Sequence, residues 1–402
     1  MNSAIKNAGV VGLGVMGFDI AFLYAMKGFH TMVHDAAPAA MDAVENRREQ
    51  TIERLRKRNR INDIEMDNVR RLMIRSSELE NLSSLDLITE AVSENTRTKL
   101  SVYRALTSAG FRGLLTTNTS SVTRATLLAD GVYDSERFAL THFFNPVLHT
   151  RMVEVVAGDM AVYHRQSLLA FLRNIGRQPV ETQDISGFVS NGILMVYAVM
   201  ALRLLESGAT IEAVDQAARA LKLLPPLFSF DSWKPAIVDD VTRVMFEHRG
   251  DSFLRSSRSL QRLAMNNPRF YIEQKTNPKI YDLAGGEKRS VNDATLKQAL
   301  RIATLVAAAR IAELGESPST IDFVAQEGIK FPEAPLREID ALGAAQILEE
   351  LASINQQLGG EPLAPPKLLN AMAEAKQKFY QDEKPNPWLS TYIHRLANHA
   401  RD

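Results

Sequence analysis

The chain contains no cysteine among its 402 residues. Disulfide bridges, thiolate catalysis and cysteine-ligated zinc or iron–sulfur sites are therefore excluded. The absence is consistent with a reducing compartment, and we expect a cytoplasmic protein. No apolar run approaches the roughly 20 residues of a membrane span. The first residues also lack the basic, apolar and cleavage regions of a signal peptide.

An excess of charge of either sign is also missing, because 47 Lys and Arg residues balance 47 Asp and Glu residues. The sequence thus predicts no general attraction to nucleic acid or to an anionic membrane. The eight histidines are scattered and no acidic calcium loop occurs, so we expect no metal site. Hydrophobic residues make up 45% of the chain, which is typical of a soluble globular protein.

The first 185 residues alternate short apolar runs with amphipathic segments, the pattern of a parallel sheet flanked by helices. A helix is expected from Met16 to Lys27, ended by Gly28. Another helix is expected from Pro38 through Arg54. Strands are expected at residues 10–11, 31–33, 86–92, 113–117, 139–142 and 152–156.

From Ser186 onward the apolar spacing becomes helical and strand patterns nearly vanish. The turn-rich stretch Gly285–Asp293 divides this all-α region into two helical domains, 186–290 and 291–402. A faint repeat relates them, since similar isoleucine, aspartate, proline and glycine positions recur: Gly208, Ile211, Asp215, Pro225 and Asp231, then Gly315, Ile321, Asp322, Pro332 and Asp340. Unrelated helical domains show such coincidences too, so spacing alone leaves duplication open.

The segment Gly12-x-Gly14-x-x-Gly17 lies between an expected strand and an expected helix, and Asp35 follows at the end of the next strand. This context predicts a dinucleotide site in a doubly wound, mostly parallel sheet of the Rossmann type over residues 1–185. The loop Gly12, Leu13, Gly14, Val15, Met16 and Gly17 would hold the pyrophosphate at the helix N-terminus. Asp35 would accept hydrogen bonds from the adenosine ribose, which favours NAD over NADP. The alternative is a glycine turn without a ligand.

His142 ends one expected strand, and Glu154 lies inside the next. A carboxylate in an apolar strand is costly to bury without a partner, and histidine is a natural one. Histidine suits the removal of a hydroxyl proton during alcohol oxidation, and a carboxylate behind it would set its tautomer. The alternative is a structural His–Glu hydrogen bond with no chemistry.

At these residues the sequence resembles the L-3-hydroxyacyl-CoA dehydrogenase family. The resemblance covers residues 7 to about 200, and the His–Phe–Phe–Asn–Pro stretch is its most specific part. The matching stretches run in the family's order: Val11–Gly17, Ile88–Asn95, Asn118–Ser121, His142–Val147, Val153–Val156 and Asp184–Asn191.

The resemblance implies roles for individual residues. It implies that His142 is the catalytic base and Glu154 its orienting partner. It also implies that Ser120 and Asn191 hydrogen-bond the reacting oxygen. Three further residues would contact the cofactor, namely Glu94, Lys99 and Asn145. For each of these polar residues a surface or capping role is the alternative.

The second helical domain resembles the last domain of the multifunctional fatty-acid oxidation enzymes, which carry two related helical domains. This strengthens the case for duplication. In the shorter enzymes of the family one helical domain forms a dimer. A second copy would cover the same apolar surface within one chain, so we expect a monomer or a homodimer.

The sequence also departs from the family. Gly192 stands where the family usually has arginine after Asn191, and Ser186 replaces a proline. A glycine-rich turn is replaced by Leu223–Leu227, and a lysine-containing segment has no counterpart near Arg269–Tyr271. The interval from Ser120 to His142 is one residue longer than usual. These departures alter the expected walls around the acyl chain.

Five basic residues fall within seven positions: Arg54, Arg56, Lys57, Arg58 and Arg60. Such a run is often a solvated helix face. The family, however, places the CoA adenine and 3′-phosphate near this helix, and guanidinium groups suit phosphate. Arg54, Lys57 and Arg58 are therefore expected to bind substrate, either CoA or an acidic acyl carrier protein. No aromatic residues interleave with the run, which argues against nucleic acid.

The leading hypothesis is NAD-dependent interconversion of a (3S)-3-hydroxyacyl thioester and a 3-oxoacyl thioester. A second hypothesis keeps this chemistry but uses an acyl-carrier-protein-bound or unusual short acyl substrate in biosynthesis. A third is a non-catalytic NAD-binding or structural relative.

Overall fold

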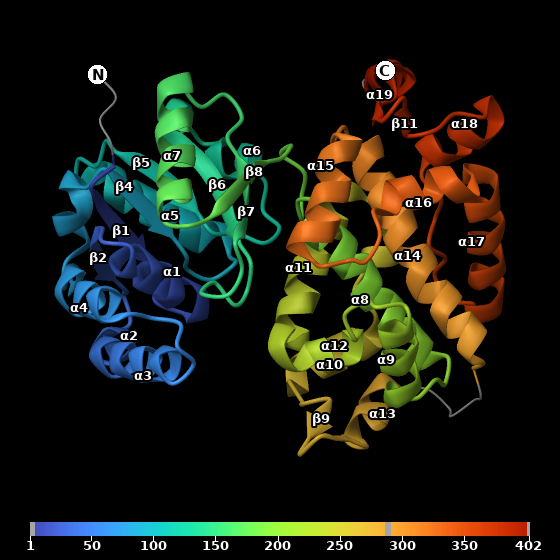
Figure 1. Cartoon of the computed structure of the whole chain (residues 1–402), viewed down its shortest axis with the longest axis horizontal. Coiled ribbons are helices and arrows are strands. Elements are labelled where there is room, and N and C mark those ends of the chain that lie inside the picture. The colour runs from blue at the N-terminus through green and yellow to red at the C-terminus, as the bar shows by residue number, and fades with distance from the viewer. Residues whose placement is uncertain (1–4, 286–290, 400–402) are drawn as a thin grey trace. The chain divides into compact units, whose positions relative to one another are not determined.

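A computed structural model describes residues 5–285 and 291–399. The chain forms two compact units that divide between Asp184 and Ile185, and each is described by itself (Figure 1). The expected boundary between the two helical domains, at residues 290 and 291, lies partly outside the described residues.

The first unit is built on an eight-stranded sheet in the order β3-β2-β1-β4-β5-β6-β7-β8. Neighbouring strands are parallel except β6 and β7, which pair antiparallel. This confirms the predicted mostly parallel sheet of the Rossmann type. The strands are β1 (Asn7–Val11), β2 (His30–His34), β3 (Met73–Arg75), β4 (Leu87–Glu90), β5 (Leu114–Thr117), β6 (Phe138–Phe143), β7 (Met152–Val156) and β8 (Gln178–Glu181).

Helices pack on both faces of the sheet, which buries every residue of β4, β5, β6 and β7. On one face Tyr24 of α1 meets Phe171 of α7 edge to face at 4.9 Å. On the other, Tyr103 of α5 packs against Phe138 of β6. Burial on two faces explains the continuous apolar runs in the sequence. The helices are α1 (Val15–Met26), α2 (Pro38–Asp42), α3 (Val44–Arg56), α4 (Asp63–Leu72), α5 (Thr96–Ser108), α6 (Arg124–Leu128) and α7 (Val162–Asn174).

The single helix expected from Pro38 through Arg54 is divided into α2 and α3. The break lies at Ala43, whose φ and ψ of −77° and −10° leave the regular helix. The apolar spacing is similar on both sides of this residue, so periodicity does not reveal the break. Gly28 follows α1 with a φ of +89°, as expected of a glycine that ends a helix.

The second unit is mainly helical, as predicted, and its two long apolar helices α8 and α14 pack along each other. Its helices are α8 (Ser190–Glu206), α9 (Ile211–Ala220), α10 (Pro226–Trp233), α11 (Pro235–Arg249), α12 (Arg258–Asn266), α13 (Lys279–Ala284), α14 (Asp293–Glu313), α15 (Pro318–Phe323), α16 (Pro335–Leu342), α17 (Ala344–Leu358), α18 (Lys367–Ala375) and α19 (Pro387–His399).

Two small hairpins interrupt this helical unit, one of β9 (Tyr271–Ile272) and β10 (Lys275–Thr276), the other of β11 (Tyr380–Gln381) and β12 (Lys384–Pro385). They were not predicted from the sequence. Two-residue strands are too short to show the alternation of apolar and polar residues that is typical of a strand. Their turn residues also have positive φ, at Glu273 and Gln274 in the first hairpin, without the glycine that usually marks such turns.

The same carboxylate contacts occur in both halves of the helical unit. Asp215 accepts hydrogen bonds from the Leu227 and Phe228 amides and the Tyr271 hydroxyl, and Asp231 accepts from the Phe270 and Tyr271 amides. In the other half the acceptors are Asp322 and Asp340, and the donors are Leu336, Phe379 and Tyr380. These are the aspartates of the repeat noted in the sequence.

Candidate active site

The glycine loop follows β1 and leads into α1. A Cβ on Gly12, whose φ is +92°, would lie 2.7 Å from the Ala91 carbonyl carbon, and one on Gly17 would lie 1.8 Å from the Gly12 oxygen. Nothing lies within 4 Å of a Cβ built on Gly14. Gly12 and Gly17 thus permit close packing of chain on chain, whereas Gly14 faces open space where a pyrophosphate can approach.

Asp35 lies beside this loop at the end of β2. Its Oδ2 accepts a hydrogen bond from the Leu13 amide at 2.6 Å, and its Oδ1 accepts from the Ala37 amide at 2.8 Å. The structure thus brings together the loop and the acidic residue that the sequence predicted as one site. Val15 is 61% exposed at the start of α1, and Met16 follows it half-buried.

Arg47 on α3 also belongs to the loop, although the sequence analysis did not identify it. Its guanidinium donates to the Leu13 carbonyl at 2.6 Å and the Gly14 carbonyl at 3.1 Å, and it stacks on the Phe18 ring. Burial lowers the pKa of Arg47, while the carboxylates of Asp19 and Asp35 oppose that shift. Arg47 thus satisfies two carbonyls of the loop, while the Gly12 and Leu13 amides donate to the His34 carbonyl and to Asp35.

Substitutions of Gly14 and Gly17 should separate ligand binding from packing. Gly17→Ala should lower the free energy of unfolding by about 1–3 kcal/mol, because the added methyl overlaps the Gly12 carbonyl. Gly14→Ala should leave stability unchanged but weaken NADH binding, because its methyl enters the open space. Urea unfolding and NADH fluorescence titration measure both effects. Unchanged NADH affinity in Gly14→Ala would place the cofactor elsewhere.

His142 and Glu154 lie opposite each other on the antiparallel strands β6 and β7. The imidazole Nδ1 is 2.9 Å from Glu154 Oε2, and the two residues are 7% and 1% exposed. Phe144 packs against the imidazole with ring centroids 5.3 Å apart. The pair lies near the carboxyl end of β6, the sheet edge that also carries the glycine loop after β1.

A buried ion-pair network lies beneath the same edge. The Lys99 ammonium is 3.0 Å from Glu90 Oε1, and both side chains are fully buried. The Tyr103 and Thr117 hydroxyls each donate to Glu90 Oε2 at 2.7 Å. Burial alone favours the neutral amine, but the carboxylates of Glu90 and Glu94 raise the pKa of Lys99 above its ordinary value.

Glu94 joins this network to the loop after β5. Its Oε2 lies 3.6 Å from the Lys99 ammonium, while its Oε1 accepts from the Thr119 hydroxyl and from the Ser120 and Ser121 amides. Burial alone would raise the pKa of Glu94, but Lys99 and these donors lower it below its ordinary value. The network therefore holds the Ser120 backbone in place. Glu90, Tyr103 and Thr117 were given no individual role from the sequence, although Glu90 is conspicuous as a carboxylate in an apolar strand.

Comparisons with known proteins identify the family of this chain. A family model described as the NAD binding domain of 3-hydroxyacyl-CoA dehydrogenase matches residues 7–185. The C-terminal domain model of the same enzyme matches residues 187–282 and again residues 298–384. The chain belongs to the 3-hydroxyacyl-CoA dehydrogenase family. It is an NAD-dependent oxidoreductase.

Individual relatives agree with the family. A 3-hydroxybutyryl-CoA dehydrogenase of Mycobacterium tuberculosis is 34% identical over 225 residues, which cover 54% of this chain and 77% of that protein. A fatty acid oxidation complex subunit alpha of Pseudomonas savastanoi is 26% identical and covers 94% of this chain. The match spans only 56% of that longer subunit. The solved structure of 3-hydroxybutyryl-CoA dehydrogenase from Escherichia coli shares the fold, with a TM-score of 0.77, 21% identity and coverage of 92% of this chain and 98% of that one.

The remaining predicted residues occupy different places in this dehydrogenase. Asn145 is exposed after β6, and Asn191 lies in the first turn of α8 in the second unit. Arg54 lies in the last turn of α3, with Lys57 and Arg58 just beyond it, and all three line a shallow groove with Glu49, Gln50 and Glu53. The Lys99 side chain has no exposed surface. Its ammonium pairs with Glu90 and Glu94 inside the protein.

Neither a cluster of metal-ligating side chains nor a membrane-crossing helix occurs in the part of the chain that the structure describes. No three histidine, aspartate or glutamate residues there form a cluster that could hold a metal ion. His30 and His34 are four residues apart, but they lie on strand β2 rather than on one face of a helix. None of the described helices combines the length and hydrophobicity needed to cross a membrane.

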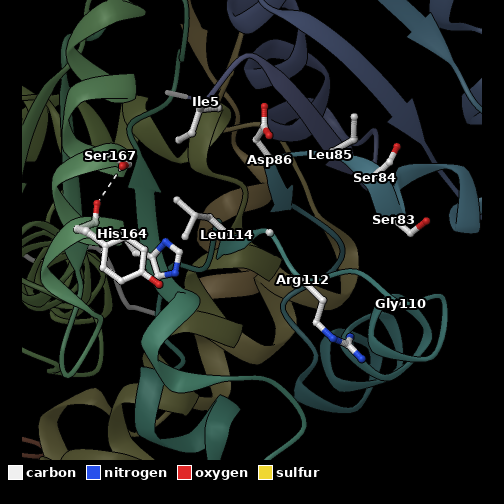
Figure 2. Close-up of a pocket in the computed structure, with 12 residues that line it drawn as sticks. Ile5, Ser83, Ser84, Leu85, Asp86, Gly110, Arg112, Leu114, His164 and Ser167 are labelled. Carbon is white, nitrogen blue, oxygen red and sulfur yellow. Dashed lines mark hydrogen bonds between the residues drawn. The ribbon is translucent and has the colours of Figure 1, made fainter. Parts of the chain in front are cut away.

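A separate cavity of about 360 Å³ lies at the amino ends of β1, β4 and β5, with α7 beside it (Figure 2). Asp86, Leu114 and His164 are among its lining residues. His164 Nε2 is buried without a hydrogen-bond partner, and burial lowers the pKa of this imidazole. The cavity contains none of the predicted site residues. It also faces the edge opposite the one where parallel sheets bind nucleotides.

Proposed function

We propose that this dehydrogenase interconverts (3S)-3-hydroxyacyl and 3-oxoacyl thioesters, with His142 as the base and Glu154 as its orienting partner. The observation that carries this proposal is the buried contact between the two side chains. A proton on Nδ1 would be donated to Glu154, so Nε2 is the ring nitrogen that would accept the substrate hydroxyl proton. Glu154 would then stabilise the imidazolium that forms.

In the oxidation, the bond between C3 and its hydrogen breaks and the hydroxyl proton passes to Nε2 of His142. The open space above Gly14 and the Asp35 carboxylate would hold the pyrophosphate and ribose of NAD, which would supply the acceptor for the hydride that leaves C3. Ser120 and Asn191 would hold the C3 oxygen. Lys99 acts indirectly, by holding Glu94 and through it the Ser120 loop.

CoA is the proposed carrier, since the similar Mycobacterium tuberculosis protein is a 3-hydroxybutyryl-CoA dehydrogenase. The basic residues Arg54, Lys57 and Arg58 would bind its phosphates. A role in fatty acid metabolism follows from the likeness to the fatty acid oxidation subunits.

A substrate panel tests the function. We expect loss of NADH absorbance with acetoacetyl-CoA and with longer 3-oxoacyl-CoA esters, at rates that report the preferred chain length. If only acyl-carrier-protein thioesters were turned over, the carrier would be acyl carrier protein and not CoA. NAD binding without turnover of any 3-hydroxyacyl or 3-oxoacyl thioester would contradict an enzymatic role.

The two helical halves are proposed to be copies of one domain. One family model matches both, and the paired carboxylate contacts of Asp215 and Asp322 recur between them. The second copy would cover α8 with α14 in place of a second subunit. Sedimentation velocity should therefore give the mass of one chain, and a stable dimer would show that another surface associates.

A further inference from the structure

Gly192 follows Asn191 in the first turn of α8, at the position where the family usually has arginine. A Cβ on Gly192 would lie 2.7 Å from Ile311 Cδ1 and 3.0 Å from Arg249 Nη2. The place where a side chain would begin is thus taken by the Ile311 side chain and by the Arg249 guanidinium, which comes from the last residue of α11. A positive group is present at the Gly192 position after all, one residue after Asn191, but another helix supplies it.

The Arg249 guanidinium has donors without acceptors. Its Nε and Nη2 atoms are buried and have no hydrogen-bond partner. Asp251 attracts this group and Arg310 repels it, but burial is the larger influence and lowers the pKa of Arg249 to about 10. Within residues 5–285 and 291–399 no carboxylate forms an ion pair with it.

The neighbouring Arg310, in contrast, has hydrogen-bond partners. Arg310 donates to Glu313 at 2.7 Å and to the Ala364 carbonyl at 3.0 Å. Nearly all buried polar groups in proteins have such partners, and a buried charge without one is costly. An unpartnered guanidinium therefore indicates a missing acceptor. Arg249 as a whole is half-buried rather than fully enclosed.

We propose that Arg249 binds an anionic oxygen of a ligand beside Asn191, in place of the arginine that Gly192 lacks. The inference rests on the proposed function, because it takes Asn191 to border the substrate. The ligand group is a carboxylate or a phosphate, since both match the donor fork of arginine. A carboxylate would come from the far end of the acyl group, and a phosphate from NAD or CoA.

Calorimetric titration of Arg249→Met tests the proposal with three ligands: NADH, acetoacetyl-CoA, and a 3-oxoacyl-CoA whose acyl chain ends in a carboxylate. We expect affinity for at least one ligand to fall about 10- to 100-fold, the usual effect of losing a charged hydrogen bond. A loss confined to the third ligand identifies the acyl carboxylate. A loss for NADH alone identifies a cofactor phosphate, and an equal loss for both thioesters identifies a CoA phosphate.

Two further variants separate binding from folding. Arg249→Met should not reduce stability in urea, because it removes a buried charge that has no protein partner. Arg243→Met, an exposed arginine on the same helix that pairs with Asp240 and Glu247, should leave all three affinities unchanged. The exchange Gly192→Arg with Arg249→Gly should restore part of the lost affinity.

Unchanged affinity for all three ligands in Arg249→Met would overturn the inference. A marked loss of stability in that variant would do the same, because it would show a structural role. Neither result touches the proposed function, which fails only if the substrate panel shows no turnover.

Discussion

His142→Ala should lower kcat about a thousandfold, the middle of the range for losing a general acid–base group. Apart from His142 and its partner Glu154, β6 and β7 carry no imidazole or carboxylate that could take the proton instead. NADH affinity should be nearly unchanged, because the glycine loop lies on other elements. Stopped-flow NADH absorbance and NADH titration measure the two quantities.

His394→Ala is the matched control, since this histidine is exposed on α19, and its kcat should equal that of the unchanged protein. Unaltered turnover in His142→Ala would remove the proposed base. A loss of NADH affinity as large as the loss of kcat would show instead that the substitution disturbs the whole sheet edge.

Lys99→Met should lower the free energy of unfolding by about 3–5 kcal/mol, the typical cost of removing one partner from a buried ion pair. Methionine fills a similar volume, so the loss comes mainly from charge. The Glu90 carboxylate would remain fully buried with only hydroxyl and amide donors, and Glu94 would lose its nearby cation. Urea unfolding at neutral pH measures the change.

Lys27→Met provides the comparison, because Lys27 pairs with Glu65 at 2.6 Å but is 34% exposed. Its loss should cost at most about 1 kcal/mol, as is usual for surface pairs. If the two variants were equally stable, the buried network would not contribute to folding beyond an ordinary surface contact.

Much of the first unit is predictable from local patterns. The strands β4 to β7 are buried on both faces, so each is a largely apolar run in the sequence. Such a run can be recognised without knowing which strands pair with it. The glycine loop is also predictable from the sequence, because its requirements are local: a positive φ at Gly12 and no room for a side chain at Gly17. The division of α2 from α3 and the two hairpins are not, since their turns use ordinary residues.

Contacts between distant segments were predicted less well. Arg47 reaches the glycine loop only because α3 folds back over it. Tyr103 and Thr117 meet Glu90 from separate elements. Arg249 lies against Gly192 across two helices, so the missing arginine could be noticed in the sequence, whereas its substitute could not.

The amino-acid order alone determined the α/β class, the nucleotide loop and the family, because each depends on short motifs and on their order along the chain. Tertiary structure decided which charges share a buried space. Coulombic and hydrogen-bond partners are set by distance in three dimensions, so the register of β6 on β7, and not the interval along the chain, places Glu154 against His142.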